Sequence, residues 1–410
     1  MISLRSITSC EVCGSDDLEP VLDLGMHPLC DDLIPIGSAD RCSEYPIEIL
    51  LCRRCVTAHQ RFQVHKKILF PPGYHYRPRF TKDVMGGLEV LHQSIETMYG
   101  PFLNKRVLDI GCNDGSMLDF FKKTGAQTIG IEPTEAATEA ITKGHCVYNA
   151  FLSKAIANKL VEDHGKPDLI VMTNVFAHIE DLNEVLDSIT TLLDKDSILI
   201  IENHYLEGIV ENGQFDTFYH EHPRTYSYSS FVQISERLGL RIINLEFPSR
   251  YGGNIRVTMS RDHDVKFDGL EEERILARER DLYQKFGGLN SILQNWMRNK
   301  SKELGTYTEK HGKIFAKAFP GRAAILIKLL GLDIAQVGAV YEQPDSLKVG
   351  YYVPGTRIPI VSDEQLFQLV DQPAYLLNLA WHIPSEISNY LRQKGYVGKV
   401  VNIMGSNDLC

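Results

Sequence analysis

This 410-residue sequence lacks the features that mark several large classes of protein. No apolar run approaches the roughly 20 residues that a membrane-spanning helix needs. The first residues, 1–6, do not have the regions of a signal peptide. No basic stretch is long enough to follow a phosphate backbone, and the net charge is −10, which argues against nucleic acid as the main partner. We therefore expect a soluble, cytoplasmic protein that binds neither membrane nor nucleic acid.

The chain is too long for one ordinary hydrophobic core, so two or three domains are expected. Its apolar content of 43% is ordinary, and each domain can bury a core of its own. The sequence leaves the oligomeric state open between a monomer and a weak homo-oligomer.

Four of the nine cysteines form two Cys-x-x-Cys pairs. In a reducing cytosol such pairs favour a metal over disulfides. Each pair places two thiolates on one side of a tight turn, and two pairs complete the tetrahedral sulfur shell that zinc prefers. Because the protein supplies all four ligands, we predict a structural zinc. Two unrelated pairs or a redox pair are the alternatives, and Cys30 and Cys42 could compete as ligands. The predicted ligands are Cys10, Cys13, Cys52 and Cys55.

Residues 107–115 predict a strand, a tight turn and the start of a helix at 116–123. Gly111 and Gly115 frame the turn, where the backbone can approach a ligand closely. A second strand, 128–131, ends in Glu132, which is placed to accept hydrogen bonds from a ribose diol. Together these features indicate a nucleoside site at the carboxyl edge of a parallel sheet.

The spacing of the glycines favours S-adenosylmethionine (SAM) over NAD. The Gly-x-x-x-Gly turn lacks the third glycine of the dinucleotide fingerprint. Asp109 and the Asn113-Asp114 pair suit a cationic ligand, whereas a pyrophosphate would be repelled. The loop 174–181, after a later strand, is expected to cover one end of the nucleoside, and His178 in it could be structural, ligand-lining or catalytic. The predicted cofactor residues are Asp109, Gly111, Asn113, Gly115, Glu132, Pro133, Asn174, Val175 and His178.

Alternating strands and helices predict an α/β fold with a doubly wound sheet. We expect a helix over 81–99, antiparallel strands at 241–246 and 254–259, and charged helices over 269–313 that break at Gly287-Gly288. The last hundred residues form a second α/β unit. The expected domains are a zinc module (1–72), a nucleoside-binding domain (73–265), a helical bridge (266–313) and a C-terminal α/β domain (314–410).

Residues 215–227 contain an unusual density of groups that exchange protons near neutral pH. Tyr219, His220, Glu221 and His222 are consecutive there. The two histidines have a spacing that suits a metal, but no third ligand is obvious nearby. We therefore favour an acid–base role.

The loop 74–79, after the zinc module, carries Tyr74, Tyr76, Arg77 and Arg79. Considered alone, it is best interpreted as a linker packed by its aromatic side chains.

These features together resemble the sugar C-methyltransferases, which act at C-3′ of nucleotide-linked 4-keto-deoxysugars. The resemblance covers nearly the whole chain. It is carried by the four cysteines, by the motif Tyr219-His220-Glu221-His222-x-x-x-Tyr226-Ser227, and by Pro354-Gly355-Thr356-x-Ile358-Pro359.

The resemblance implies a small zinc module, a central Rossmann-like SAM domain and a Rossmann-like C-terminal domain that binds substrate. It implies His222 as the base that forms an enolate, with His220 as the second candidate. Tyr219 and Glu221 would position and polarise the substrate. Tyr76 would reach in from the loop 74–79, which becomes a substrate lid.

The sequence departs from the family at two places. Arg77-Pro78-Arg79 stands where the family has serines, and the loop 319–324 has one glycine where the family has a glycine-rich loop. Arg322 in that loop could bind a phosphate by charge. We therefore expect an anionic acceptor that can differ from the usual deoxythymidine-diphosphate sugar. The predicted substrate-binding residues are Tyr74, Arg77, Arg79, Arg224, Tyr226 and Arg322.

Two other functions remain open at this point. One is an O- or N-methyltransferase acting on a related sugar-like or anionic acceptor. The other is a non-catalytic zinc scaffold that binds SAM or a nucleotide sugar.

Overall fold

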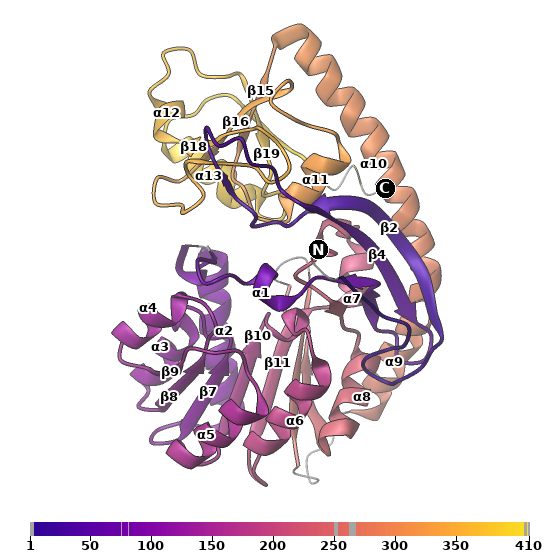
Figure 1. Ribbon diagram of the computed structural model, residues 1–410, viewed down its shortest axis with the longest axis vertical. Helices are drawn as coiled ribbons and strands as arrows, with labels where there is room; N and C mark the ends of the chain where they lie inside the picture. The colour runs from indigo at the N-terminus through magenta and orange to yellow at the C-terminus, as the bar shows by residue number, and fades with distance from the viewer. Residues whose placement is uncertain are drawn as a thin grey trace. The chain divides into compact units, whose positions relative to one another are not determined.

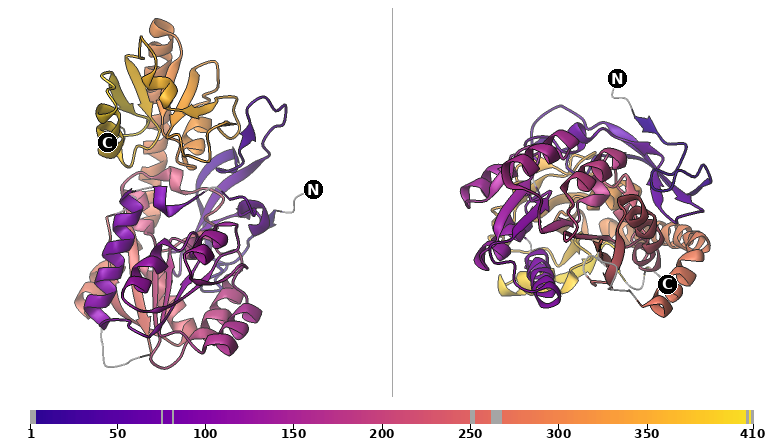
Figure 2. Two further views of the ribbon diagram at one scale, coloured as in Figure 1. Left: turned by 90° about the vertical axis from the view of Figure 1, so that its left-hand side faces the viewer. Right: turned by 90° about the horizontal axis from the view of Figure 1, so that it is seen from below.

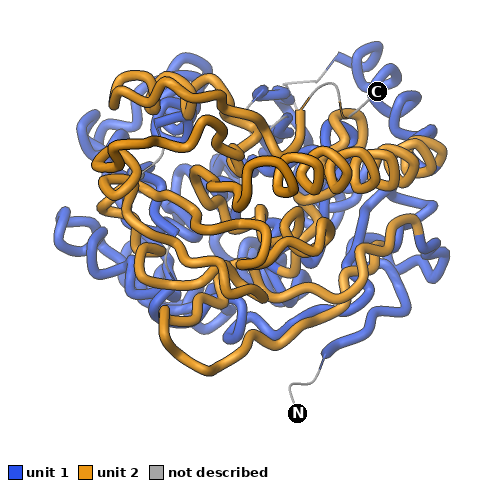
Figure 3. Tube along the Cα trace, turned by 90° about the horizontal axis from the view of Figure 1, so that it is seen from above, with its two compact units in different colours: residues 1–20, 50–209, 221–283 blue, residues 21–49, 210–220, 284–410 orange. Residues whose placement is uncertain are grey.

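The structure, a computed structural model, describes residues 4–74, 76–80, 82–249, 253–261, 268–405 and 408. The chain forms two compact units, each assembled from segments that are distant in the sequence (Figure 3). Unit 1 comprises Met1–Pro20, Leu50–Ile209 and Glu221–Tyr283. Unit 2 comprises Val21–Ile49, Val210–His220 and Gln284–Cys410.

A seven-stranded sheet forms the centre of unit 1, in the order β13-β14-β11-β10-β7-β8-β9 (Figure 1). The neighbouring pairs from β11 to β9 are parallel, and β14 and β13 add an antiparallel edge. This confirms the predicted doubly wound sheet and the antiparallel pair. The strands are β7 (Arg106–Ile110), β8 (Gln127–Ile131), β9 (Cys146–Tyr148), β10 (Leu169–Thr173), β11 (Ile198–His204), β13 (Arg241–Glu246) and β14 (Asn254–Ser260).

Helices cover both faces of this sheet, which explains why its parallel strands are nearly continuous apolar runs. One face packs against α2 and α3 through residues such as Leu91 and Phe121. The other face packs against α5, α6 and α8 through residues such as Leu160, Ile189 and Phe231. The helices are α2 (Lys82–Tyr99), α3 (Ser116–Lys123), α4 (Ala136–Thr142), α5 (Lys154–His164), α6 (Leu182–Leu192), α8 (Tyr228–Leu238) and α9 (Gly269–Arg280).

The N-terminal segment adds a second sheet, in the order β12-β5-β4-β2. Its long strands β2 and β4 are neighbours (Figure 2). Each strand has residues in both units. The elements here are β1 (Arg5–Ser6), β2 (Leu18–Pro28), β3 (Ile34–Pro35), β4 (Glu44–Cys52), β5 (Ala58–Gln60), β6 (Phe62–Gln63), α1 (Lys66–Leu69), η1 (Pro78–Phe80) and β12 (Arg224–Thr225).

Unit 2 contains a five-stranded parallel sheet, in the order β18-β16-β15-β19-β20. This confirms the predicted C-terminal α/β unit. A buried ion pair joins Lys317 at the end of β15 to Asp363, with 2.6 Å between Nζ and Oδ2. The elements are β15 (Ile314–Lys317), β16 (Val337–Glu342), β17 (Tyr351–Tyr352), β18 (Ile360–Ser362), β19 (Tyr375–Asn378), β20 (Lys399–Asn402), α11 (Ala323–Leu329), α12 (Glu364–Phe367) and α13 (Pro384–Gln393).

The predicted break at Gly287-Gly288 is wrong. The helix α10 (Leu282–His311) runs through both glycines, and the interruption lies at Asp281, between α9 and α10. A glycine inside a helix costs about 1 kcal/mol relative to alanine. The buried stripe of Phe286, Leu289, Leu293 and Trp296 recurs every three or four residues, and its burial outweighs that cost.

Two short helices precede residues 219–222, the tyrosine–histidine motif, namely α7 (Leu206–Glu211) and η3 (Phe215–Thr217). Among the residues that the structure describes, no helix is both long and apolar enough to cross a membrane.

Candidate active site and metal centre

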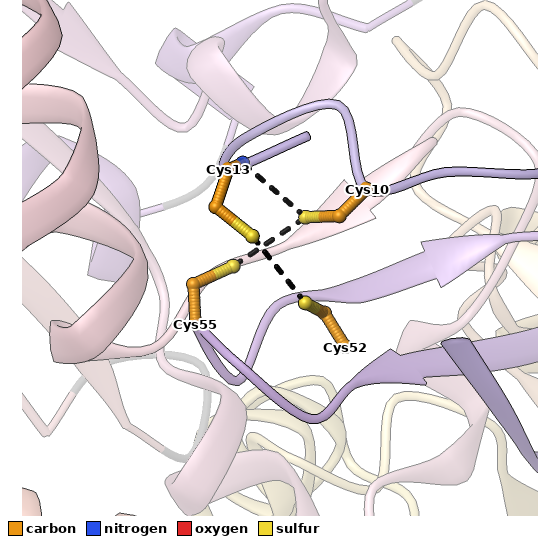
Figure 4. Close-up of side chains that lie close together, drawn as sticks. All are labelled: Cys10, Cys13, Cys52 and Cys55. Atoms are coloured by element: carbon orange, nitrogen blue, oxygen red, sulfur yellow. Dashed lines mark hydrogen bonds between the residues drawn. The ribbon is translucent and has the colours of Figure 1, made fainter. Parts of the chain in front are cut away.

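The four predicted metal ligands lie together in unit 1 (Figure 4). Their sulfur atoms are all within 4.8 Å of one another. Cys10 Sγ is 3.4 Å from Cys55 Sγ, and Cys13 Sγ is 3.6 Å from Cys52 Sγ. Zinc–sulfur bonds of about 2.3 Å in a tetrahedron place the sulfurs about 3.8 Å apart. The geometry therefore fits a zinc ion held by four cysteines.

The glycine loop between β7 and α3 leaves no room for side chains at either glycine. Gly111 and Gly115 have φ angles of 76° and 78°, which glycine adopts at little cost. A Cβ on Gly111 would lie 2.5 Å from Val175 Cγ2, and one on Gly115 would lie 2.8 Å from His145 Cδ2. The predicted residues Gly111 and Val175 are thus brought together.

Two buried carboxylates at the strand ends give this loop its negative character. Glu132 accepts hydrogen bonds from the backbone N–H groups of Asn113 (3.1 Å) and Thr134 (2.8 Å), so its carboxylate is fixed beside the loop. Burial, Glu132 and Asp114 together raise the pKa of Asp109 well above its usual value. A cationic ligand would relieve this repulsion, which fits SAM better than a pyrophosphate. Pro133 follows Glu132 directly and begins the turn toward α4.

The loop after β10 contacts both the glycine loop and the tyrosine–histidine motif. Asn174 adopts a left-handed φ of 53° and donates its N–H to Glu202 O at 2.7 Å. His178 lies in η2 (Phe176–His178), and its Nδ1 is 2.8 Å from Glu221 O. Burial lowers the pKa of His178 to about 4, so its imidazole is neutral near pH 7. The sequence predicted Asn174 and His178 as cofactor residues. In the structure His178 also contacts Glu221 of the tyrosine–histidine motif.

Two further imidazole rings lie beside the ring of His222. The ring of His178 is 4.8 Å from that of His222, and the ring of His204 is 5.3 Å from it, between centroids. His204 was missed by the sequence analysis. The available signal was its position at the carboxyl end of β11, where ligand-binding residues of parallel sheets concentrate.

The neighbouring residue Glu221 also belongs to unit 1. Its carboxylate accepts a hydrogen bond from the Tyr74 hydroxyl at 2.8 Å, which joins the loop 74–79 to the motif. Tyr226 is fully buried, and its hydroxyl accepts a bond from Arg224 Nε at 3.1 Å.

Tyr219 and His220 belong to unit 2. His220 Nε2 donates to Tyr45 O at 3.0 Å, and burial lowers the pKa of His220 to about 4. His220 is therefore neutral near pH 7, and the choice between His222 and His220 as the base stays a prediction. Among the described residues, no group of three or more potential metal ligands includes either histidine.

The predicted acceptor-binding arginines already have carboxylate partners. Arg77 and Arg79 both pair with Glu139 on α4, and Arg79 also reaches Asp114 at 3.1 Å. Arg224 is fully buried and pairs with Glu11. Their role toward an acceptor stays a prediction.

Tyr76 and Arg322 lie in different surroundings. Tyr76 is 44% exposed, and its carbonyl accepts a bond from Asn113 Nδ2 at 3.2 Å. In unit 2, Arg322 Nε is 3.3 Å from buried Asp216, whose carboxylate also accepts a bond from Trp381 Nε1 at 2.9 Å.

Three family models match successive parts of the chain. Residues 10–70 match a model described as "Putative zinc binding domain", residues 88–245 a "Methyltransferase domain", and residues 249–402 a "C-methyltransferase C-terminal domain". The order of the three is the predicted order of modules.

Similarity to curated proteins extends over almost the full length. The chain is 30% identical over 399 residues to the C-methyltransferase NovU of Streptomyces niveus, which covers 94% of this chain and 92% of the relative. Ubiquinone biosynthesis O-methyltransferase of Pelagibacter ubique is 27% identical over 103 residues, or 25% of this chain and 42% of that protein.

Among solved structures, magnesium protoporphyrin IX methyltransferase from Synechocystis PCC 6803 with bound SAH is 16% identical. It covers 44% of this chain and 84% of its own, with a TM-score of 0.35. The near full-length match to NovU and the C-methyltransferase C-terminal domain confirm the predicted resemblance. They also decide against the O- or N-methyltransferase and the non-catalytic scaffold. The chain therefore belongs to the SAM-dependent C-methyltransferase family, with a cysteine cluster for structural zinc.

Proposed function

We propose that this C-methyltransferase methylates a carbon next to a ketone of a nucleotide-linked deoxysugar, and that the carbon is C-3′ of a 4-keto sugar. The resemblance of the motif at 219–227 to the sugar C-methyltransferases supports this acceptor. The observation that carries the proposal is the position of His222, which is 4% exposed and flanked by two further imidazoles.

The chemistry needs a base because carbon is a poor nucleophile until it loses a proton. A ketone acidifies the neighbouring C–H, and His222 removes that proton to leave an enolate. The enolate carbon then forms a bond to a methyl group in line with the departing sulfur. SAM supplies this electrophilic methyl group when it is bound. His222 then releases the proton to solvent, so each turnover yields one proton.

The neighbours of His222 suit this role. His178 is neutral near pH 7, so it places no positive charge beside the imidazolium that forms. Its bond to Glu221 O fixes the backbone next to the base. The Glu221 carboxylate, which accepts a hydrogen bond from Tyr74, is proposed to orient a sugar hydroxyl. Tyr219 and Tyr76 are proposed to complete the contacts to the acceptor and its enolate oxygen.

In this proposal residues 1–72 bind zinc, residues 73–265 bind SAM, residues 266–313 form a bridge, and residues 314–410 bind the acceptor. It places the enzyme in the cytoplasm, with an anionic acceptor. Binding of its phosphates by Arg77, Arg79 or Arg322 would require these side chains to exchange their present carboxylate partners.

Solvent exchange at the acceptor carbon tests the proposal. A deoxythymidine-diphosphate 4-keto-6-deoxyhexose is incubated with enzyme and S-adenosylhomocysteine in D₂O, and deuterium at C-3′ is measured. We expect exchange with the wild type, and a fall of about 10²- to 10⁴-fold in exchange and in methyl transfer for His222→Gln. The Kd for SAM should remain unchanged. His164→Gln, at an exposed histidine on α5, is the matched control.

Absence of exchange and of C-methylation with the wild type would reject the 4-keto sugar as acceptor. Loss of exchange in His220→Gln, with exchange retained in His222→Gln, would transfer the role of base to His220.

A further inference from the structure

Backbone pairing joins the cysteine cluster to the segment that follows His222. The strand β5 begins three residues after the ligand Cys55 and pairs antiparallel with β12, with Arg224 opposite His59. Next to this pair, the N–H of Gln60 donates to Pro223 O at 2.9 Å. Pro223 directly follows His222 in the chain. The proposed base is therefore adjacent in the chain to Pro223, whose carbonyl is bonded to β5, the strand that follows the zinc ligand Cys55.

Side chains beside the cysteine sulfurs make a second connection. The hydroxyl of Thr57 lies 3.0 Å from Cys55 Sγ and 2.8 Å from the hydroxyl of Ser230. His59 Nε2 lies 3.3 Å from Cys10 Sγ. Thr57 and His59 are both fully buried, so neither can replace these partners with bulk water.

The turn between the first two ligands makes a third connection. Glu11 pairs with the buried guanidinium of Arg224 on β12. Arg237 on α8 donates to the carbonyls of Glu11 (3.0 Å) and Val12 (3.1 Å). Ser227, at the N-cap of α8, donates to Cys55 O at 3.3 Å. Both Cys-x-x-Cys turns thus bind the segment 223–237.

We propose that the zinc cluster is a brace for residues 222–230, which holds His222 in register for proton abstraction, and that Thr57 and His59 are positioning residues of this brace. This inference rests on the proposed role of His222. The cofactor loop is built separately on β7 and β8, where Gly111 N donates to Ile131 O at 2.7 Å. Zinc therefore supports the catalytic step more than it supports SAM binding.

The physical reason is the steep dependence of catalysis on geometry. A displacement of about 1 Å in a reacting group can cost about 10²-fold in rate. Without zinc, the four sulfurs lose the ion that holds the two turns together. The β5–β12 pair and the hydrogen bonds of Thr57 are then no longer anchored to an ordered turn. His222 moves together with Pro223, its neighbour in the chain.

Amide hydrogen exchange on the full-length protein tests the brace without any acceptor. Zinc-loaded protein is compared with protein stripped by a strong chelator, with metal content measured in both. We expect exchange of residues 222–230 to rise by at least about tenfold on stripping, a loss of local opening energy of about 1.4 kcal/mol. Exchange at 107–115 and the Kd for SAM should change by less than about twofold.

Substitution of Thr57 tests the link to catalysis. Thr57→Val keeps the shape and removes both bonds of the hydroxyl, so we expect kcat to fall by about tenfold with unchanged Kd for SAM. Thr57→Ser keeps the hydroxyl and should restore most of kcat. Thr97→Val, at an exposed threonine on α2, is the control.

Two results would overturn the brace. One is an equal rise of exchange at 107–115 and 222–230, because zinc would then support the whole of unit 1. The other is an unchanged kcat in Thr57→Val. A wild-type enzyme that fails to methylate the keto sugar would count against the proposed function alone, since the exchange comparison needs no acceptor.

Discussion

At the scale of single residues, the glycine loop between β7 and α3 does not tolerate added side chains. Gly111 combines a left-handed φ of 76° with a Cβ position 2.5 Å from Val175. Either feature alone disfavours a side chain, and the two act together at the place where the backbone is predicted to approach the cofactor. The sequence identified both glycines, but the contact with Val175 comes from the loop after β10, which is distant in the chain.

Gly111→Ala should therefore impair both folding and cofactor binding. We expect the free energy of unfolding to fall by about 1–3 kcal/mol because of the strained φ. The Kd for SAM should rise by about tenfold or more, since the loop must shift to clear Val175. Denaturant unfolding and calorimetric titration with SAM measure the two effects.

The clash and the backbone strain can be separated. Adding Val175→Ala to Gly111→Ala removes the two closest atoms, Val175 Cγ1 and Cγ2, and should restore part of the SAM affinity, with the φ strain retained. Gly86→Ala on α2, where a Cβ meets nothing within 4 Å, is the control. It should stabilise the protein by about 0.5–1 kcal/mol. A Gly111→Ala protein with normal SAM affinity would contradict this account.

Burial of His220 makes the stability of the protein depend on pH. His220 donates to a backbone carbonyl and has its pKa lowered to about 4 by burial. An unfolded histidine has a pKa of about 6.5. The folded pKa is lowered, so the unfolded state binds the proton more readily, and stability falls as the pH drops from about 6.5 toward 4.

This gives a pH-dependent prediction for His220→Gln. Between pH 7 and pH 5 the wild type should lose about 2 kcal/mol of unfolding free energy through His220. The variant lacks the titrating ring, so its loss over this interval should be smaller by about that amount. Urea unfolding at the two pH values measures it. Equal losses in the two proteins would show that His220 does not take up a proton on unfolding in this range.

At the scale of elements, α10 shows how packing overrides local propensity. Gly287 and Gly288 predicted a break, yet both lie on the exposed side of a continuous helix. The neighbouring Phe286 and Leu289 are buried, and the stripe continues to Trp296, whose Nε1 donates to Ile403 O at 2.9 Å. The glycines are tolerated because the opposite face is packed.

Gly288→Ala should accordingly stabilise the protein. A Cβ at this position meets nothing within 4 Å. The expected gain is about 0.5–1 kcal/mol in unfolding free energy, from the lower backbone entropy of the unfolded chain. Denaturant unfolding measures the gain, with methyl transfer as a second readout. A loss of stability would mean that the helix needs a bend at these glycines.

At the scale of the whole molecule, sequence order and spatial units do not coincide. The chain crosses between the two units at Pro20/Val21, Ile49/Leu50, Ile209/Val210, His220/Glu221 and Tyr283/Gln284. One of these crossings divides the tyrosine–histidine motif between His220 and Glu221. Local patterns reveal elements and their order, but they carry no information on which distant segments pack together.

The sequence by itself determined the chemistry that needs particular residue types at fixed spacing. Two Cys-x-x-Cys pairs specified the metal cluster, and Gly111, Gly115 and Glu132 specified the tight loop that is predicted to bind the cofactor. These motifs are local, because a tight turn or a strand end has a geometry set by the few residues within it.

The tertiary structure alone decided the neighbours of the motif. It set His204 beside His222, joined Tyr74 to Glu221, and fixed the predicted arginines against Glu139 and Glu11. The physical reason is that these contacts form between strand ends and loops far apart in the chain. Their partners follow from how apolar faces pack, and no local spacing records that packing.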